Sequence, residues 1–255
     1  KFVFLVAATW SPRKGLKYII DAYCKAFKKS DPVCLFLLCK YGTRPYGAMY
    51  NVCSTIWKRV KNRRILHKLP GMQMVEYYGD SMWSIPVSFK RMCDELCVDL
   101  NNAPEICLLD IPIHENILPN FYASSHCVVG ASLGESTWLP GIQALAMGLP
   151  IIQMRQNNGG IGEYISSKCS LLYNNKTVEK ASEELSKGTS MYYKNTYFPI
   201  PNVEELSMRM KEVYNNYKYW LETIKPISEK INKQWDWKDK IVPVVERLRT
   251  IHEQL

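Results

Sequence analysis

The sequence has no hydrophobic run that approaches the roughly 18 apolar residues of a membrane-spanning helix, and no secretory signal at its start. It also contains no internal repeat and no low-complexity tract. The nine cysteines are odd in number, and most of them lie in apolar contexts, which predicts buried reduced thiols rather than a disulfide framework. We therefore expect a cytoplasmic globular protein.

Metal-binding and nucleic-acid-binding patterns are also scarce. Cys93 and Cys97 have helical spacing, but no second pair of zinc ligands accompanies them. The basic residues lack the interleaved aromatic platform of common RNA-binding modules, so we expect neither a metal nor a nucleic acid as partner. The net charge of +9 is compatible with a lysine-rich surface, phosphorylated ligands or peripheral contact with an anionic membrane.

The 255 residues, of which 47% are hydrophobic, suffice for one large domain or two small ones. The chain starts at Lys1 directly in a predicted strand, and we interpret it as part of a longer protein. Apolar runs typical of buried parallel strands alternate with segments of helical spacing, which predicts an α/β fold with a Rossmann-like parallel sheet and flanking helices. The predicted strands are 2–8, 33–38, 106–109, 127–129, 151–152 and 170–173.

Other segments are organised differently. Residues 65–104 are rich in methionine and aromatics without clean periodicity and are interpreted as an insertion, although 88–100 has helical spacing. Residues 50–60 are predicted to be a helix that ends in a basic run, 14–27 and 114–124 are predicted helices, and 176–189 is a polar stretch. Terminal helices are predicted from 203 to 255, with Pro226 separating the first two.

The stretch from Cys127 to Glu163 holds the clearest functional pattern. A strand leads into a loop at 130–138, then into a helix with Pro140 in its first turn, a second strand, and a loop with paired glycines at 159–160. In parallel α/β sheets, ligands bind beyond the carboxyl ends of such strands. We therefore expect a ligand at the loop that precedes the helix.

The chemistry of this loop favours a nucleotide sugar. Free N–H groups and the helix dipole suit a phosphate, with Ser136 or Thr137 as the predicted cap. Glu135 would be repelled by that phosphate and is better suited to sugar hydroxyls close by. Lys14, at the start of the first predicted helix, lies at the same sheet edge, where its ammonium suits a diphosphate.

Two motifs together resemble the C-terminal half of retaining glycosyltransferases with the GT-B fold, specifically glycosyltransferase family four. One is the first strand, the Pro-x-Lys-Gly turn and the first helix, at residues 6–27. The other has a Ser, a Glu before a Leu-Pro, a Gly-x-Pro strand entry and a Gly-Gly-x-x-Glu loop. Its matching positions are Ser132, Glu135, Leu139, Pro140, Ala144, Ala146, Gly148, Pro150, Gly159, Gly160 and Glu163.

The resemblance implies a metal-independent transferase without a cofactor, whose substrate is a nucleoside-diphosphate sugar. Glu135 and Lys14 are the implied catalytic residues. The implied donor-binding residues are Arg13, Ile111, Pro112, Ser136, Thr137, Trp138, Leu139 and Gln143. Gln143 would hold the ribose, and Ile111 with Pro112 would flank the base.

The resemblance also implies a division of labour. The whole chain would be the donor-binding domain, its terminal helices would brace an N-terminal domain outside this chain, and the acceptor would be a glycan, a lipid or a protein. Asp110 follows a predicted strand and could pair with a guanine edge, which slightly favours a GDP-sugar over a UDP-sugar.

This sequence departs from the family pattern in three places. Gln143 replaces the second Glu of the family, and 136–138 replaces a Gly-Phe-Gly, which narrows the space at the sugar. Ala8 or Thr9 stands where the family has an Arg, which leaves Lys14 and Arg13 to neutralise the diphosphate.

Two other interpretations remain. Residues 130–134 match the G-x-S-x-G elbow of α/β-hydrolases, but His252 is the only downstream histidine and the helix starts too late. A lone GT-B half with these departures could instead be a non-catalytic nucleotide-binding or scaffold module that works with a partner chain.

Overall fold

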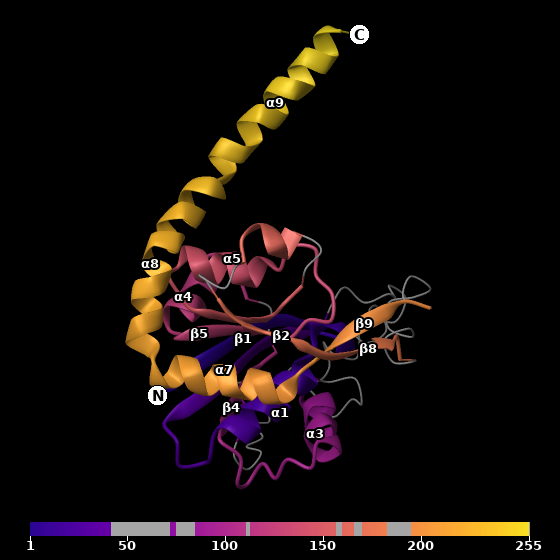
Figure 1. The fold of residues 1–255 in the computed structure, drawn as a ribbon, viewed down its shortest axis with the longest axis vertical. Coiled ribbons are helices and arrows are strands. Elements are labelled where there is room, and N and C mark those ends of the chain that lie inside the picture. Colours follow the sequence, from indigo (N-terminus) through magenta and orange to yellow (C-terminus); the bar gives the residue numbers. More distant parts are fainter. Residues whose placement is uncertain are drawn as a thin grey trace, which may run out of the picture.

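The structure of the protein is a computed structural model that describes residues 1–41, 72–74, 85–110, 113–156, 160–165, 170–182 and 195–254. Its centre is a parallel sheet with helices on both faces (Figure 1), so the predicted α/β fold is confirmed. The helix predicted at 50–60 and the paired glycines at 159–160 lie wholly or partly outside the described residues.

The sheet consists of seven described strands in the order β3-β4-β2-β1-β5-β6-β7, all paired in parallel. The central strands β1 and β2 are apolar over most of their length because helices cover both faces of the sheet, and Thr9 and Lys40 lie near their carboxyl ends. Their bounds are β1 Phe2–Trp10, β2 Val33–Tyr41, β3 Met72–Met74, β4 Glu105–Leu109, β5 Cys127–Gly130, β6 Ile151–Met154 and β7 Leu171–Tyr173.

The order of the strands reverses between β1 and β5. After β1, strands β2, β3 and β4 all lie on one side of it, with β3 at the edge, whereas β5, β6 and β7 lie on the other side. At such a switch point the two loops leaving the carboxyl ends diverge and open a place for a ligand. The motifs at Lys14 and Glu135 follow β1 and β5 respectively, so topology alone brings them to this point.

The helices form two layers. Helices α4 and α5 lie on one face of the sheet, and α1, α3 and α7 lie on the other (Figure 1). The bounds are η1 Pro12–Lys14, α1 Leu16–Ala26, α3 Ile85–Glu95, α4 Leu118–Ala123, α5 Leu139–Ala146, η2 Gly160–Glu163, α7 Val203–Asn215, α8 Tyr217–Gln234 and α9 Trp237–Glu253. Helix α3 lies at 85–95, where the sequence predicted a helix at 88–100. Because α3 and β3 both fall in the segment interpreted as an insertion, that segment contains regular secondary structure.

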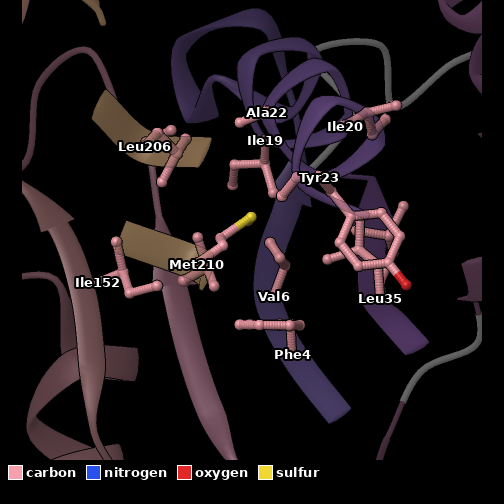
Figure 2. Packing of buried hydrophobic residues seen from close by; sticks show 14 of the residues in the cluster. Phe4, Val6, Ile19, Ile20, Ala22, Tyr23, Leu35, Ile152, Leu206 and Met210 are labelled. Carbon is pink, nitrogen blue, oxygen red and sulfur yellow. The ribbon is translucent and has the colours of Figure 1, made fainter. Parts of the chain in front are cut away.

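The core has one apolar cluster on each side of the sheet because successive residues of a strand point to opposite faces. Phe4 and Val6 join the larger cluster, whereas Leu5 joins the other. In Figure 2, Met210 of α7 extends toward Val6, beside Ile152. Each such side chain stabilises the fold by about 1.5–3 kcal/mol when it is fully buried.

The C-terminal helices differ from the prediction in where they break. Pro226 lies inside α8, and the break falls at Asn216. Buried Ile224 and Ile231 flank Pro226 and pack in the cluster that contains α5, which compensates for the backbone hydrogen bond that proline removes. Helix α9 then extends away from the domain (Figure 1), and its described side chains are all exposed.

A small antiparallel hairpin was not predicted. Strand β8 (Asn175–Lys180) pairs with β9 (Tyr197–Pro201), and the two form a separate sheet. The sequence of β8 has no apolar alternation and is typical of a polar stretch. In the structure every residue of β8 is exposed. On β9, Phe198 is buried against Leu133, in the loop that follows β5.

Candidate functional site

The turn after β1 and the loop after β5 meet at the switch point. Gly15 has a φ of 66°, and a Cβ at this residue would lie 2.0 Å from the carbonyl oxygen of Ala131. Only glycine combines this left-handed conformation with so close an approach to backbone. Gly15 therefore fixes the distance between the segments that carry Lys14 and Glu135.

Hydrogen bonds join the same two segments. The N–H of Leu133 donates to the carbonyl oxygen of Arg13 at 2.8 Å, and Ser132 Oγ lies 3.2 Å from that oxygen. The guanidinium of Arg13 in turn donates to the carbonyl oxygen of Gly134. The loop after β5 is thus held by both the backbone and the side chain of Arg13.

Three charged side chains and one hydroxyl converge there. The ammonium of Lys14 donates to Oε1 of Glu135, the guanidinium of Arg13 lies 3.5 Å from that oxygen, and Ser132 Oγ lies 2.9 Å from it. The side chains of Arg13, Lys14 and Glu135 are 25%, 18% and 11% exposed, so water screens the group only partly. The cluster keeps one net positive charge, which suits an anionic ligand.

The sequence predicted Lys14 and Glu135 at one sheet edge, and the structure brings them into direct contact. The expectation that Glu135 stands apart from the cation that receives the phosphate is not met in this arrangement. Spacing along the sequence gives the edge on which a residue lies, but it does not give the side-chain rotamer that decides between contact and separation.

Trp138 occupies the position before α5. It has a φ of 49°, is 6% exposed and forms the N-cap without a side-chain hydrogen bond. The prediction that Ser136 or Thr137 caps this helix is therefore wrong. The indole lies between two glycines, because a Cβ would come within 2.5 Å of the ring at Gly130 and within 2.3 Å at Gly141. Packing of the large ring in this slot determines where the helix begins.

The backbone carbonyl groups just before α5 accept hydrogen bonds, whereas the backbone N–H groups there donate none within the described residues. The hydroxyl of Tyr164 donates to the carbonyl oxygens of Thr137 and Trp138 at 2.6 and 2.8 Å. Within the described part of the chain, no hydrogen bond uses the N–H of Thr137, Trp138 or Leu139. These donors lie at the positive end of the α5 dipole, where an anion is favoured.

A small cavity lies beside this cluster. Its volume is about 10 Å³, which is room for about one water molecule. It is lined by Val6, Ala7, Ala8, Lys14, Ile19, Val129, Gly130, Ala131, Ser132 and Trp138. The cavity itself therefore does not hold a ligand larger than water.

Sequence reasoning missed Gln153, which lies directly beneath Trp138. Gln153 pairs with Gly130 in the sheet register, and a Cβ at residue 130 would lie 2.0 Å from its Oε1. The side chain is fully buried, and its amide nitrogen and oxygen have no hydrogen-bond partner among the described residues. Its position in an apolar strand run was the available signal, because buried amides are normally paired.

The predicted nucleoside-binding residues lie elsewhere on this edge. Gln143 is on the exposed side of α5, and its Oε1 accepts a hydrogen bond of 2.7 Å from the hydroxyl of Tyr122. Asp110 follows β4, and burial raises the pKa of its carboxyl. Ile111 and Pro112 lie outside the described residues. Ser136 and Leu139 are exposed around the start of α5.

The hydrolase interpretation does not fit the geometry. Ser132 is 2% exposed and its hydroxyl donates to Glu135, so it has no histidine as a base in the described structure. His252 lies near the end of α9, which projects away from the sheet (Figure 1).

No protein-family model and no curated protein matches the sequence. Solved structures do match the fold. The chain is similar to the C-terminal domain of a glycosyl transferase group 1 family protein from Francisella tularensis, with 12% identity, a TM-score of 0.56, and coverage of 93% of this chain and 87% of that one. It is also similar to HepE from Anabaena, solved in complex with UDP-glucose, with 13% identity, a TM-score of 0.58, and coverage of 100% and 49%.

A third similar structure is the sucrose-phosphate synthase from Thermosynechococcus elongatus, with 14% identity, a TM-score of 0.62, and coverage of 100% and 46%. The chain thus spans about half the length of the two longer proteins. Its fold is that of the C-terminal domain of GT-B glycosyltransferases. Among the described residues, no helix is both long and apolar enough to cross a bilayer.

Proposed function

We propose that this chain is the donor-binding domain of a retaining, metal-independent GT-B glycosyltransferase of family four, which works in the cytoplasm. The observation that carries the proposal is the meeting of Arg13, Lys14 and Glu135 at the switch point between β1 and β5. Cations, a carboxylate and free helix amides together match the phosphate and hydroxyl groups of a nucleotide sugar.

The diphosphate binds at Lys14 and Arg13 and at the free amides of Thr137, Trp138 and Leu139 in this proposal. When the bond between the anomeric carbon and the phosphate oxygen breaks, negative charge collects on the departing diphosphate. Fixed cations and oriented N–H groups stabilise that charge without reorganisation, which is commonly a large contribution to catalysis. The arrangement supplies by side chains what a metal ion supplies in other transferases.

The rest of the donor extends to both sides of the diphosphate. Glu135 binds sugar hydroxyls, with Ser136 and Trp138 bordering the same space. Gln143 binds the ribose, and Ile111 with Pro112 flanks the base. The half-buried Asp110 favours a guanine slightly, whereas the HepE complex carries UDP-glucose, so both nucleotides belong in the first titration.

The acceptor is a glycan or a lipid, and we propose that an N-terminal domain outside this chain holds it. The support is the coverage of only 49% and 46% of two similar proteins. The exposed apolar side of α9 is available for the bracing role proposed for the terminal helices. The basic surface is compatible with peripheral contact with an anionic membrane.

Calorimetric titration with GDP and UDP tests the donor site. We expect one nucleotide to bind and Lys14→Ala to weaken it by about tenfold or more, because a charge-assisted contact to a phosphate is lost. Lys25→Ala is the matched control, since Lys25 is an exposed lysine of the same segment that pairs with Asp21 and Glu204. Absence of binding by either nucleotide would overturn the proposal.

A non-catalytic nucleotide-binding module is the second candidate. The observation that favours it is Gln143, which replaces a family Glu and whose amide oxygen is already occupied by Tyr122. The two candidates differ in turnover. With an N-terminal domain and an acceptor supplied, transfer of the sugar from a nucleotide sugar to the acceptor with release of nucleoside diphosphate, lost in Glu135→Ala, would support the transferase, and binding without transfer under the same conditions would support the module.

A further inference from the structure

In the structure, Glu135 is the counterion of the lysine that the proposed donor needs. Its Oε1 accepts from Lys14 Nζ and from Ser132 Oγ at 2.9 Å, and Arg13 Nη1 lies 3.5 Å away. Glu135 is therefore held by three groups in a site that water reaches poorly. The carboxylate occupies the side of Lys14 that faces the loop after β5.

A phosphate and this carboxylate are incompatible at one ammonium. Both are anions, and like charges at about 4 Å repel by several kcal/mol at the effective dielectric of a protein surface. The cavity beside Lys14 has room for only about one water molecule, so it does not itself hold a phosphate. Glu135 is the anion that must leave.

We propose that Glu135 is an intramolecular competitor for Lys14, and that the site admits only ligands whose phosphate charge suffices to displace it. This inference rests on the proposed donor site and names the ligand class that the site selects. A nucleoside diphosphate or pyrophosphate carries enough charge, whereas a phosphodiester has a single negative charge, the same as the carboxylate that it must replace.

Displacement also couples the two halves of the ligand. Once the diphosphate takes over Lys14 and Arg13, Glu135 is released from both cations and becomes free to accept hydrogen bonds from sugar hydroxyls. Ser132 limits this movement because its hydroxyl, 2% exposed, holds the carboxylate near Lys14. Ser132 is thus a positioning residue for Glu135, and it has no contact with the ligand in this scheme.

The test measures affinity for pyrophosphate, UDP and GDP in wild type and three variants. Glu135→Gln should bind these ligands about tenfold more tightly, because it removes a competing charge-assisted contact. Glu135→Asp keeps the charge but shortens the reach to Lys14, and should lie between wild type and Glu135→Gln. Ser132→Ala should tighten binding about two- to threefold, because it frees the competitor from one restraint.

Glu105→Gln is the matched control. Glu105 also pairs with a lysine, Lys1, but it begins β4 at the opposite edge of the sheet. The substitution makes the same change in net charge far from the site, so it should leave nucleotide affinity unchanged. Circular dichroism and thermal unfolding of all variants verify that each retains the fold.

The substitution Glu135→Gln should weaken the contribution of the sugar to binding, whereas it strengthens the binding of the diphosphate. Glu135→Gln should reduce the preference for a nucleotide sugar over its free nucleoside diphosphate, because the carboxylate no longer binds the hydroxyls. If Glu135 is a competitor, Glu135→Gln should bind the diphosphate more tightly and should also lose the preference for the nucleotide sugar.

Several results would overturn the inference. If diphosphates bind wild type but Glu135→Gln binds them equally or more weakly, Glu135 does not compete. If Glu135→Asp matches wild type while Glu135→Gln is tighter, net charge alone accounts for the effect and contact with Lys14 does not matter. If no variant binds any diphosphate, the proposed donor site fails and the inference fails with it.

Discussion

Gly15 and Ala131 touch through their backbones, and this contact links the turn after β1 to the loop after β5. A Cβ at residue 15 would lie 2.0 Å from the carbonyl oxygen of Ala131 and 2.9 Å from its carbonyl carbon. A backbone group is not free to rotate away as the end of a side chain can. The distance between the proposed catalytic residues therefore depends on the absence of a side chain at position 15.

Gly15→Ala should destabilise the protein and displace Lys14. The left-handed φ of 66° costs an alanine about 1–2 kcal/mol, and relief of the clash with Ala131 adds to this. Urea unfolding should show a loss of about 2 kcal/mol or more, with weaker nucleotide binding in the folded protein. Gly162→Ala is the control, because a Cβ there meets no atom of the described residues within 4 Å. Equal stability of the two variants would contradict the prediction.

Gly141→Ala should destabilise the protein, although replacing glycine by alanine inside a helix usually stabilises it. Alanine in place of glycine normally stabilises a helix by about 0.5–1 kcal/mol. Here the added Cβ would lie 2.3 Å from the indole of Trp138, which has no room to retreat because Gly130 bounds it on the other side. We expect a net loss of stability in urea unfolding and a change in tryptophan fluorescence. A gain in stability would mean that the indole moves easily.

Much of this architecture was predictable from the sequence because the parallel strands are apolar throughout. Strands β1, β2 and β4 extend one to three residues beyond their predicted bounds at one end, and the strand–loop–helix pattern around Glu135 gave the correct sheet edge. A polar strand such as β8 gives no comparable signal, because its stability comes from pairing with β9 rather than from its own burial.

The candidate site was predictable only in part, because its geometry depends on side-chain rotamers and packing. Residue types gave a cation and a carboxylate at one edge, but direct contact between Lys14 and Glu135 depends on rotamers and on the close approach at Gly15. The cap before α5 was wrongly predicted because packing of Trp138 between glycines overrides the capping preference of Ser136 or Thr137. Burial of Gln153 depends on the neighbouring Gly130, which no spacing rule identifies.

Gln153→Met should stabilise the fold. Methionine has nearly the length of glutamine and adapts to irregular space, but it brings no amide that needs partners. Both polar atoms of the Gln153 amide lack hydrogen bonds, and a buried unsatisfied group costs about 1–3 kcal/mol. We expect a gain of about 1 kcal/mol or more in urea unfolding. A loss of stability would mean that a bound water satisfies the amide.

Asp110→Asn should change how stability depends on pH. Burial raises the pKa of the Asp110 carboxyl above its ordinary value of 3.8, so the folded state binds this proton more tightly than the unfolded state does. The favourable contribution is present below pH 3.8 and is lost as the pH rises through the raised folded pKa. At neutral pH the ionised Asp110 carboxyl therefore lowers the stability of the folded state, and an uncharged asparagine removes this effect.

Urea unfolding from pH 3 to pH 7 measures this effect. Asp110→Asn should gain on wild type as the pH rises. If Asp110 also pairs with a guanine, the stabilised variant should lose affinity for GDP more than for UDP, because an asparagine amide cannot accept from both donors of the guanine edge. Parallel pH curves for Asp110→Asn and wild type would show that the carboxyl is solvated, and the GDP comparison would then decide its role alone.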